Sequence, residues 1–214
     1  MKILAPDVFL AHQQQGIDII DTRDATDFKT GFIPGAINIP VNKIKEWAGR
    51  FVNTDQPILV VAIPYAEQET EELLTQNAHT NIIGCLQGGF DAWKQAGHHT
   101  DMIIDVEPDE LMMDIPFDDK LVVIDVRNSL EYAQGHLQQA INLPLNEISD
   151  PLNIARFDET DNIYLHCGGG SRSIMAASVL KKHGIHNLRN IVGGWVKIKE
   201  EPKAEIVKEP TVLN

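Results

Sequence analysis

Short apolar runs alternate along the chain with stretches of helical spacing. Residues 17–20 and 58–61 form such runs in the first half, and residues 121–124 and 163–165 form them in the second. Each run has the length of a β-strand rather than a helix, and turn residues and helical patterns follow it. Strands that alternate with helices predict an α/β fold whose sheet is largely parallel.

The two halves of the chain carry the same pattern. Asp21-Thr22-Arg23 recurs as Asp125-Val126-Arg127, 104 residues further on, and residues 31–40 recur at the same offset as residues 135–144. Gly-Gly-Phe at 88–90 recurs as Gly-Gly-Trp at 193–195. A period near 100 residues exceeds the roughly 20–50 residues of solenoid repeats and indicates a duplicated domain. We therefore expect one domain over residues 1–100, a second over 101–198, and a polar, loosely ordered tail over 199–214.

Charge and cysteine content exclude several classes of function. The 214 residues include 31 acidic and 18 basic side chains, a formal net charge of −13, which disfavours binding to nucleic acid or to an anionic membrane. With two cysteines there is no disulfide framework, so a reducing compartment is expected. The first residues do not resemble a signal peptide, and no apolar run reaches membrane-spanning length. These features together predict a cytoplasmic protein.

The strongest candidate for chemistry is Cys167, which follows the apolar run at 163–165. The residues after it form a glycine-rich loop: Gly168, Gly169, Gly170, Ser171, Arg172 and Ser173. Three successive glycines allow backbone N–H groups to converge on an anion, and a helix beginning at Ser173 would add its positive end. Donors of this kind lower a cysteine pKa and favour the reactive thiolate. The pattern indicates an activated sulfur nucleophile.

Two other interpretations of Cys167 remain open on the residues alone. It could be a buried structural cysteine in a tight turn, although packing needs neither the glycines nor Arg172. It could also serve phosphatase or arsenate-reductase chemistry, where loops typically read Cys-x5-Arg. Here four residues separate Cys167 from Arg172, which gives a smaller ring that suits a single sulfur atom better than a phosphate. Neither a metal site nor a cofactor site is indicated.

The order of these motifs resembles the rhodanese sulfurtransferase family over nearly all of both halves. The resemblance rests on Asp-x-Arg, Glu131-x-x-x-Gly135-His136, Ala-Ile-Asn-Leu-Pro at 140–144, Cys-x4-Arg-Ser and Gly-Gly-Trp. It implies that a cysteine takes sulfane sulfur from thiosulfate or a low-molecular-weight persulfide and passes it to a thiol or cyanide-like acceptor.

The resemblance also assigns roles to residues of the second half. Cys167 would carry the sulfur, residues 168–173 would form the cradle, and Arg172 would bind the anion. We expect Asp125, Arg127, Glu131 and His136 to be structural, with Arg127 paired to Glu131. His166 is expected to pack at the end of its strand, a general-base role being the alternative.

The first half departs from the pattern at the reactive loop. Aligning residues 58–61 with 163–166 places Ala62 where Cys167 stands, followed by Ile63-Pro64-Tyr65. Proline removes an N–H donor that an anion site would use. We expect this domain to be catalytically inactive. Cys85 is expected to pack as a small apolar residue, with a resolving-thiol role as the alternative.

An inactive domain followed by an active one is also similar to the rhodanese region that follows a metallo-β-lactamase-like domain in bacterial persulfide-processing enzymes. That resemblance implies an alternative in which this chain is part of a larger enzyme, with the metallo-β-lactamase-like domain as its N-terminal partner. The metal motif of such a domain is not found in the chain itself.

Overall fold

The chain folds into two compact α/β units, described here from a computed structural model. The first unit covers residues 1–102 and the second begins at Ile103. The structure describes residues 1–209. Each unit contains a five-stranded sheet in which all neighbouring strands are parallel, so the prediction of a duplicated α/β fold is confirmed.

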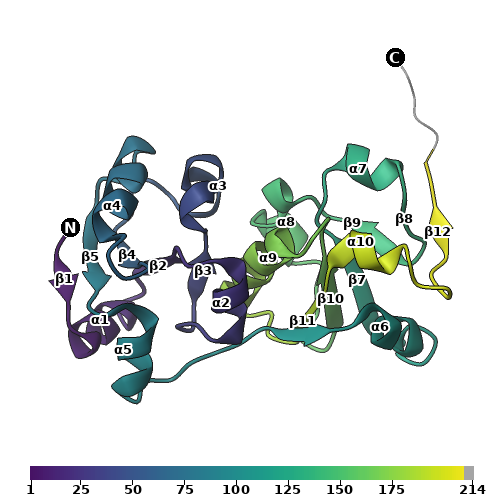
Figure 1. The fold of residues 1–214 in the computed structure, drawn as a ribbon, viewed down its shortest axis with the longest axis horizontal. Coiled ribbons are helices and arrows are strands. Elements are labelled where there is room, and N and C mark those ends of the chain that lie inside the picture. Colours follow the sequence, from purple (N-terminus) through teal and green to yellow (C-terminus); the bar gives the residue numbers. More distant parts are fainter. Residues whose placement is uncertain (210–214) are drawn as a thin grey trace. The chain divides into compact units, whose positions relative to one another are not determined.

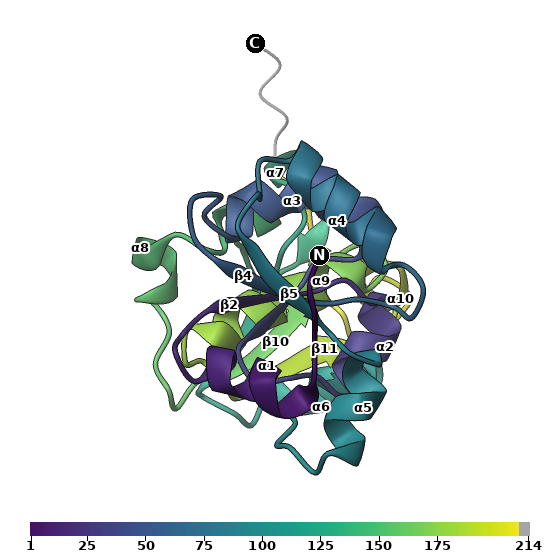
Figure 2. The same ribbon diagram turned by 90° about the vertical axis from the view of Figure 1, so that its left-hand side faces the viewer.

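The first unit is built on a sheet of strand order β1-β5-β4-β2-β3 (Figure 1). Its strands are β1 (Ile3–Leu4), β2 (Asp18–Asp21), β3 (Ala36–Asn38), β4 (Ile58–Val61) and β5 (Ile82–Leu86). Its helices are α1 (Pro6–Gln13), α2 (Ala25–Thr30), α3 (Ile44–Phe51), α4 (Glu67–Gln76) and α5 (Gly89–Gln95), with a 3-10 turn η1 (Val41–Lys43). Helices α3 and α4 cover one face of the sheet, and α1 and α5 cover the other (Figure 2).

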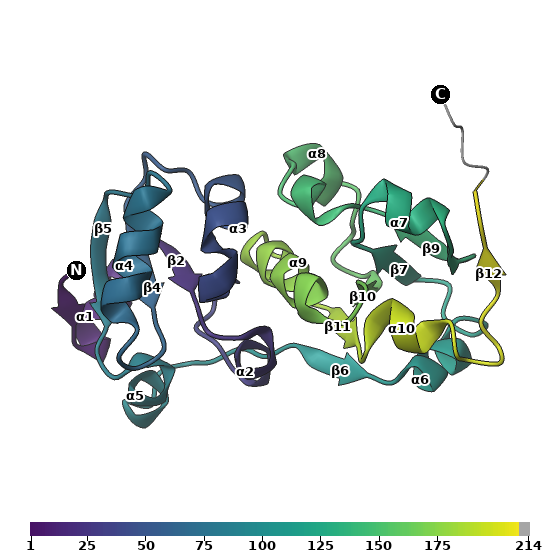
Figure 3. The same cartoon turned by 45° about the horizontal axis from the view of Figure 1, so that its top comes forward.

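The second unit repeats this order as β6-β11-β10-β7-β9. Its parallel strands are β6 (Ile104–Val106), β7 (Leu121–Asp125), β9 (Ala140–Asn142), β10 (Asn162–His166) and β11 (Leu188–Ile191). Its helices are α6 (Pro108–Asp114), α7 (Ser129–Ala133), α8 (Pro151–Ile154), α9 (Ser171–Lys182) and α10 (Gly194–Ile198), with a 3-10 turn η2 (Leu145–Glu147). Figure 3 shows α9 beside β10 and β11, and α6 close to α10.

The central strands are buried on both faces, which explains why they read as apolar runs rather than as alternating patterns. In β10, Ile163 and Leu165 are fully buried, and Tyr164 packs into an apolar cluster with residues of α6 and α10. Most residues of α9 are buried as well. The sheet therefore holds the end of β10, and the loop after it, in a fixed position.

The segment after α10 contains a strand, so the prediction of a loosely ordered tail is wrong for this part of it. Strand β12 (Ile206–Val207) pairs antiparallel with β8 (His136–Leu137), and the Glu209 amide donates to the carbonyl of Ala133 at 3.0 Å. Ala204 packs against the apolar cluster of the second unit. The last five residues of the predicted tail, 210–214, lie outside the described residues.

Candidate active site

The candidate nucleophile lies at the carboxyl end of the parallel sheet, where α/β proteins place their ligand sites. Strand β10 ends at His166, beside the end of β7 at Asp125, and Cys167 follows immediately. The Cys167 side chain is buried, and its Sγ atom accepts a hydrogen bond from the amide of Gly170 at 3.0 Å. The loop thus aims one backbone donor at the sulfur.

Helix α9 begins at Ser171, so the prediction that it begins at Ser173 is wrong by two residues. Gly170 is the N-cap residue and has a φ of +112°, a conformation that other residues rarely adopt. The turn at Gly170 starts the helix early and brings Arg172 and Ser173 into its first turn. A Cβ atom placed on Gly169 would meet nothing within 4 Å, so open space borders the loop at that residue.

A row of polar side chains runs from beside the sulfur to the edge of the sheet. The Ser173 hydroxyl lies 3.7 Å from Cys167 Sγ and 2.7 Å from Asn190 Oδ1. Asn190, on β11, is buried and donates from Nδ2 to Asp105 on β6 at 2.7 Å. Asp105 thus fixes the amide so that its oxygen faces Ser173. Sequence reasoning missed Asn190, which lies 17 residues beyond Ser173 with no motif to mark it.

Arg172 pairs with Glu131, a contact that the sequence did not predict. The two outer guanidinium nitrogens donate to the two carboxylate oxygens, Nη1 to Oε2 at 2.7 Å and Nη2 to Oε1 at 2.8 Å. Both side chains are one-third exposed. The pairing with Arg172 lowers the pKa of Glu131, and the pKa of Arg172 is raised in turn. A Cβ atom on Gly168 would lie 3.2 Å from Arg172 Nη2, so the guanidinium lies close to the loop backbone.

Arg127 pairs with Asp125, and the predicted pairing of Arg127 with Glu131 is wrong. The Arg127 Nη2 atom donates to Asp125 Oδ2 at 2.5 Å and to the Gly135 carbonyl at 2.8 Å, while Nε also contacts the carboxylate. The guanidinium lies over the ring of Trp195, 4.5 Å from its centre. Asn142 donates to the carbonyls of Asp125 and Arg127, both at 2.9 Å.

The first unit contains the same frame with its own residues. Arg23 pairs with Asp21, donates to the Gly31 carbonyl at 2.9 Å and lies 4.2 Å from the ring centre of Phe90. Asn38 donates to the carbonyls of Asp21 and Arg23. The first unit has these contacts although it lacks a cysteine at the nucleophile position. The contacts therefore stabilise the fold of the loop region and do not by themselves provide chemistry.

The Gly-Gly-Trp motif holds the reactive loop from the other side. The Trp195 amide donates to the Cys167 carbonyl at 2.7 Å, and the Val196 amide donates to the Gly168 carbonyl at 3.3 Å. Gly194 has a φ of +54°, and a Cβ atom there would lie 2.3 Å from the Cys167 carbonyl oxygen. The sequence marked this motif as part of the repeat, but the close backbone approach that requires glycine is visible only in the structure.

The two histidines near the site contact groups other than the sulfur. His136 Nδ1 lies 2.9 Å from the Tyr132 carbonyl, and its ring stacks on that of Tyr132. His166 is fully buried, with Nε2 3.8 Å from Asp125 Oδ2 and Nδ1 3.4 Å from the Cys167 carbonyl. Burial lowers the pKa of His166, which favours the neutral ring. These contacts fit packing at the end of the strand better than a general-base role.

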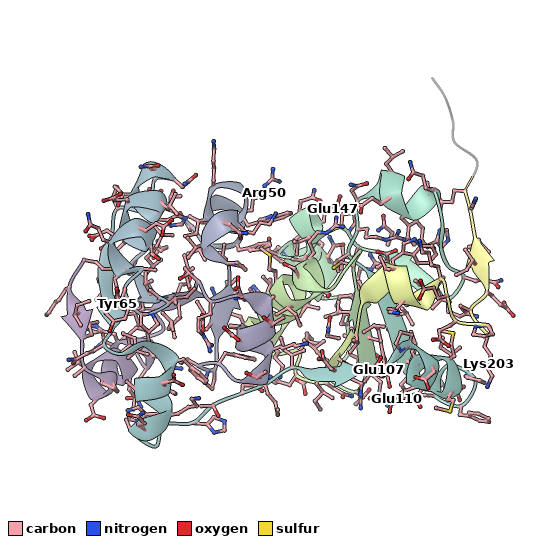
Figure 4. The ribbon with its side chains drawn as sticks, viewed as in Figure 1. Arg50, Tyr65, Glu107, Glu110, Glu147 and Lys203 are labelled. Atoms are coloured by element: carbon pink, nitrogen blue, oxygen red, sulfur yellow. The ribbon has the colours of Figure 1, made fainter. Side chains whose placement is uncertain are left out.

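The corresponding loop of the first unit has lost the features that surround Cys167. Val61 pairs with Asp21 as His166 pairs with Asp125, so Ala62 occupies the position of Cys167 and the alignment drawn from the sequence is confirmed. Tyr65 (labelled in Figure 4) is fully exposed, with a φ of +72°. A cavity of about 400 Å³, lined in part by Arg23, Ala62 and Phe90, lies next to the loop.

Cys85 lies on β5 in the place that Asn190 takes on β11, since it pairs with Val60 as Asn190 pairs with Leu165. It is buried, and this burial raises the pKa of its thiol to about 11. A thiol in this state is a poor nucleophile near neutral pH. Its environment fits the predicted packing role and disfavours the resolving-thiol alternative.

Comparison with known protein families agrees with the geometry of both units. The model of the rhodanese-like domain matches residues 5–96 and again residues 103–201. The chain belongs to the rhodanese family. The two matches place one family domain in each structural unit. At the level of the family, the activity is sulfur transfer.

Curated relatives match part of the chain. A putative sulfur carrier protein, YrkF of Bacillus subtilis, is 38% identical over 77 residues, which are 36% of this chain and 40% of that protein. A putative mitochondrial thiosulfate sulfurtransferase of Schizosaccharomyces pombe is 30% identical over 99 residues, 41% of this chain and 70% of that protein. The tRNA uridine(34) hydroxylase of Pectobacterium carotovorum is 30% identical over 92 residues, 41% of this chain and 26% of that protein. The chain thus spans less than half the length of two of these three relatives.

Among solved structures, a thiosulfate sulfurtransferase from Pseudomonas aeruginosa is similar over 99% of this chain and 44% of its own, with 17% identity and a TM-score of 0.45. In residues 1–209 no helix has both the length and the apolar character needed to cross a membrane.

Proposed function

We propose that the second unit transfers sulfane sulfur through a persulfide on Cys167, taking it from thiosulfate or a low-molecular-weight persulfide. The observation that carries this proposal is the Gly170 amide directed at Cys167 Sγ, in a loop that follows the central strand of a rhodanese-like domain. Support also comes from two relatives, which are named as a putative sulfur carrier protein and a putative thiosulfate sulfurtransferase.

In the first step the Cys167 thiolate attacks the sulfane sulfur of the donor. The sulfur–sulfur bond of the donor breaks, and its electron pair leaves with sulfite or with a thiolate. Cys167 then holds the transferred sulfur as a persulfide anion. Backbone N–H donors stabilise such a large, diffuse anion without supplying a competing base. The Gly170 amide lies where it could donate to this anion, the Ser173 hydroxyl lies 3.7 Å from the sulfur, and Gly169 borders open space.

In the second step a thiol or cyanide-like acceptor attacks the terminal sulfur, and the electron pair of the cysteine–sulfur bond returns to Cys167 as the thiolate. Neither step requires a metal or a cofactor, because both are exchanges at sulfur. Arg172 stands at the loop with a positive charge that can interact with an anionic donor. The first unit, with Ala62 at the nucleophile position, serves in this proposal as a non-catalytic partner domain.

The experiment that tests this proposal is intact-protein mass spectrometry after addition of thiosulfate or glutathione persulfide. We expect the mass to increase by one sulfur atom, and cyanide to remove it. The Cys167→Ala variant should lose the adduct, and Cys85→Ala should keep it, which makes Cys85 the matched control. An adduct on Cys85 with none on Cys167 would disprove the proposal.

Aryl phosphate turnover distinguishes the alternative phosphatase or arsenate-reductase chemistry. We expect negligible hydrolysis for two reasons. The four residues between Cys167 and Arg172 form a loop that is small for a phosphate group, and both outer nitrogens of the Arg172 guanidinium already donate to Glu131. Efficient hydrolysis that is lost in Cys167→Ser would replace the sulfur assignment with phosphate chemistry. The further alternative, a role as the rhodanese region of a larger persulfide-processing enzyme, uses the same Cys167 chemistry and is tested by the length of the native reading frame.

A further inference from the structure

The guanidinium that would receive an anionic donor is already bound to a carboxylate. Glu131 accepts hydrogen bonds from both outer nitrogens of Arg172, at 2.7 and 2.8 Å. This bidentate geometry is the one that a sulfonate or carboxylate of a donor would also use. An incoming anion must therefore displace Glu131 or bind without those two nitrogens.

Glu131 is held in this position by the start of its own helix. Its Oε2 atom accepts a hydrogen bond from the Asn128 amide at 3.2 Å, while Asn128 Oδ1 accepts from the Glu131 amide at 2.8 Å. This reciprocal capping box fixes the carboxylate relative to the first turn of α7. Moving Glu131 away from Arg172 would also break the capping box. A donor that displaces Glu131 must therefore overcome both the ion pair with Arg172 and the hydrogen bond from the Asn128 amide.

The pairing changes the charge that a donor meets. Asp125 and Arg127 neutralise each other below the loop, as Glu131 and Arg172 do beside it. With the Cys167 thiolate added, these five groups carry one net negative charge, within a chain whose net charge is −13. A doubly charged donor is repelled by this arrangement more strongly than a singly charged one.

We propose that Glu131 determines donor specificity, selecting persulfides that carry a single negative charge over the thiosulfate dianion. This inference rests on the proposed function of Cys167 and concerns the substrate class of that site. It uses an ion pair that the chain places across 41 residues of sequence. Glu131 acts through Arg172, and does not itself touch the sulfur that is transferred.

The two donors place different demands on Arg172. Thiosulfate and the thiolate give the Cys167 persulfide anion and sulfite, so a dianion both enters and leaves. A persulfide anion and the thiolate give the Cys167 persulfide anion and a thiolate, so a single charge enters and leaves. Both reactions break one sulfur–sulfur bond and form another, with no net oxidation. Only the first needs a free guanidinium for a doubly charged group.

The test is the single-turnover rate of persulfide formation on Cys167, measured by mass spectrometry with two donors. These are thiosulfate and 2-hydroxyethyl persulfide, whose only charge is on sulfur. In Glu131→Gln the capping box can persist, since glutamine also supplies an oxygen at this position. We expect its second-order rate with thiosulfate to rise roughly tenfold, the size of effect expected for one nearby charge in a partly buried site. The rate with the alkyl persulfide should stay within about twofold of the unmodified protein.

The first unit provides the matched control. Asp27 stands at the position of Glu131 in the repeat, beside a loop that has no arginine, so Asp27→Asn removes the same charge without freeing a guanidinium. We expect this variant to leave the ratio of the two rates unchanged. An unchanged ratio in Glu131→Gln as well would overturn the inference while leaving the proposed function intact, whereas no Cys167 persulfide with either donor would instead overturn the proposed function.

A second measurement needs no variant. Sulfate is a dianion that cannot donate sulfur, and it should compete with the alkyl persulfide only if Arg172 is available. We expect millimolar sulfate to leave the rate of the unmodified protein unchanged at constant ionic strength. Strong inhibition by millimolar sulfate would show that Glu131 does not withhold the guanidinium, and would overturn the inference even if Glu131→Gln did not fold.

Discussion

Replacing Gly194 by alanine should damage the reactive loop in a way that an equivalent replacement in the first unit does not. The new Cβ atom would lie 2.3 Å from the Cys167 carbonyl oxygen, a backbone atom that cannot rotate away. Relief of this contact requires a shift of roughly 1 Å between α10 and the loop, a displacement that can cost about 10²-fold in rate. The Trp195 amide, 2.7 Å from the same oxygen, would lose its hydrogen bond.

The control is Gly89→Ala. Gly89 has a φ of +62° and Gly194 a φ of +54°, so both replacements incur a backbone cost of roughly 1–2 kcal/mol for an alanine in the left-handed region. A Cβ atom on Gly89 would lie 3.1 Å from the Ala62 carbonyl oxygen, a contact that a few tenths of an ångström relieve. The loss of the Trp195 hydrogen bond adds about 1 kcal/mol in Gly194→Ala. We therefore expect destabilisation of about 2–3 kcal/mol for Gly194→Ala and about 1–2 kcal/mol for Gly89→Ala.

Urea unfolding measures the stability of each variant. The single-turnover rate of Cys167 persulfide formation is measured separately, without urea, so that both variants are folded. Gly194→Ala should slow the reaction by one to two orders of magnitude, in line with a loop shift of about 1 Å. Gly89→Ala should leave the rate within about twofold, since Gly89 belongs to the unit that has Ala62 at the nucleophile position. Equal rates in the two variants would refute the reasoning that the Gly-Gly-Trp turn positions the nucleophile.

Two further predictions concern buried polar groups. Asn190→Ala should remove one hydrogen-bond partner each from Ser173 and Asp105. We expect it to destabilise the protein by about 1–3 kcal/mol and to slow persulfide formation severalfold, as measured by urea unfolding and mass spectrometry. An unchanged rate would show that the contact with Asn190 does not position Ser173. Burial lowers the pKa of His166 below its usual 6.5, so the unfolded chain binds a proton at this histidine more tightly than the folded chain does. The free energy of unfolding is therefore unaffected by this histidine above pH 6.5 and decreases as the pH falls below that value. His166→Gln should flatten the loss of stability between pH 6.5 and 5 in urea unfolding, and an identical slope would contradict this.

The positions of strand β10 and of Cys167 at its end could be predicted from the sequence, because a local pattern of apolar residues marks them. The run at 163–165 marked β10 because a central parallel strand is apolar on both faces, and Cys167 directly after it had to lie at the carboxyl edge of the sheet. The repeat then placed Ala62 at the same edge of the first unit. The first inference needs only the end of a strand, and the second needs only the self-similarity of the two halves of the sequence.

The partner of Glu131 could not be obtained in this way. Arg127 lies four residues from Glu131, a spacing that favours an ion pair only when both residues are helical. Arg127 instead precedes α7, and its side chain turns back to Asp125, two residues away, and to the Gly135 carbonyl. Glu131 faces α9, where the left-handed turn at Gly170 has brought Arg172 into the first helical turn. The pairing joins the first turns of two helices that are 41 residues apart in the sequence, and no local pattern encodes it.

The duplication separates the residues that shape the loop from those that give it chemistry. The pair Asp21–Arg23 repeats the contacts of Asp125–Arg127 down to the glycine carbonyl and the aromatic ring, yet Ala62 follows the strand in the first unit. A frame that persists without a nucleophile is a property of the fold, because it joins β2 to the helix and strand that follow. What distinguishes the second unit is therefore the set formed by Cys167, Gly170 and the Arg172–Glu131 pair. Variants of Asp125 or Arg127 should lower the stability of the second unit, as variants of Asp21 or Arg23 should lower that of the first. Variants of the set around Cys167 should instead alter the sulfur chemistry.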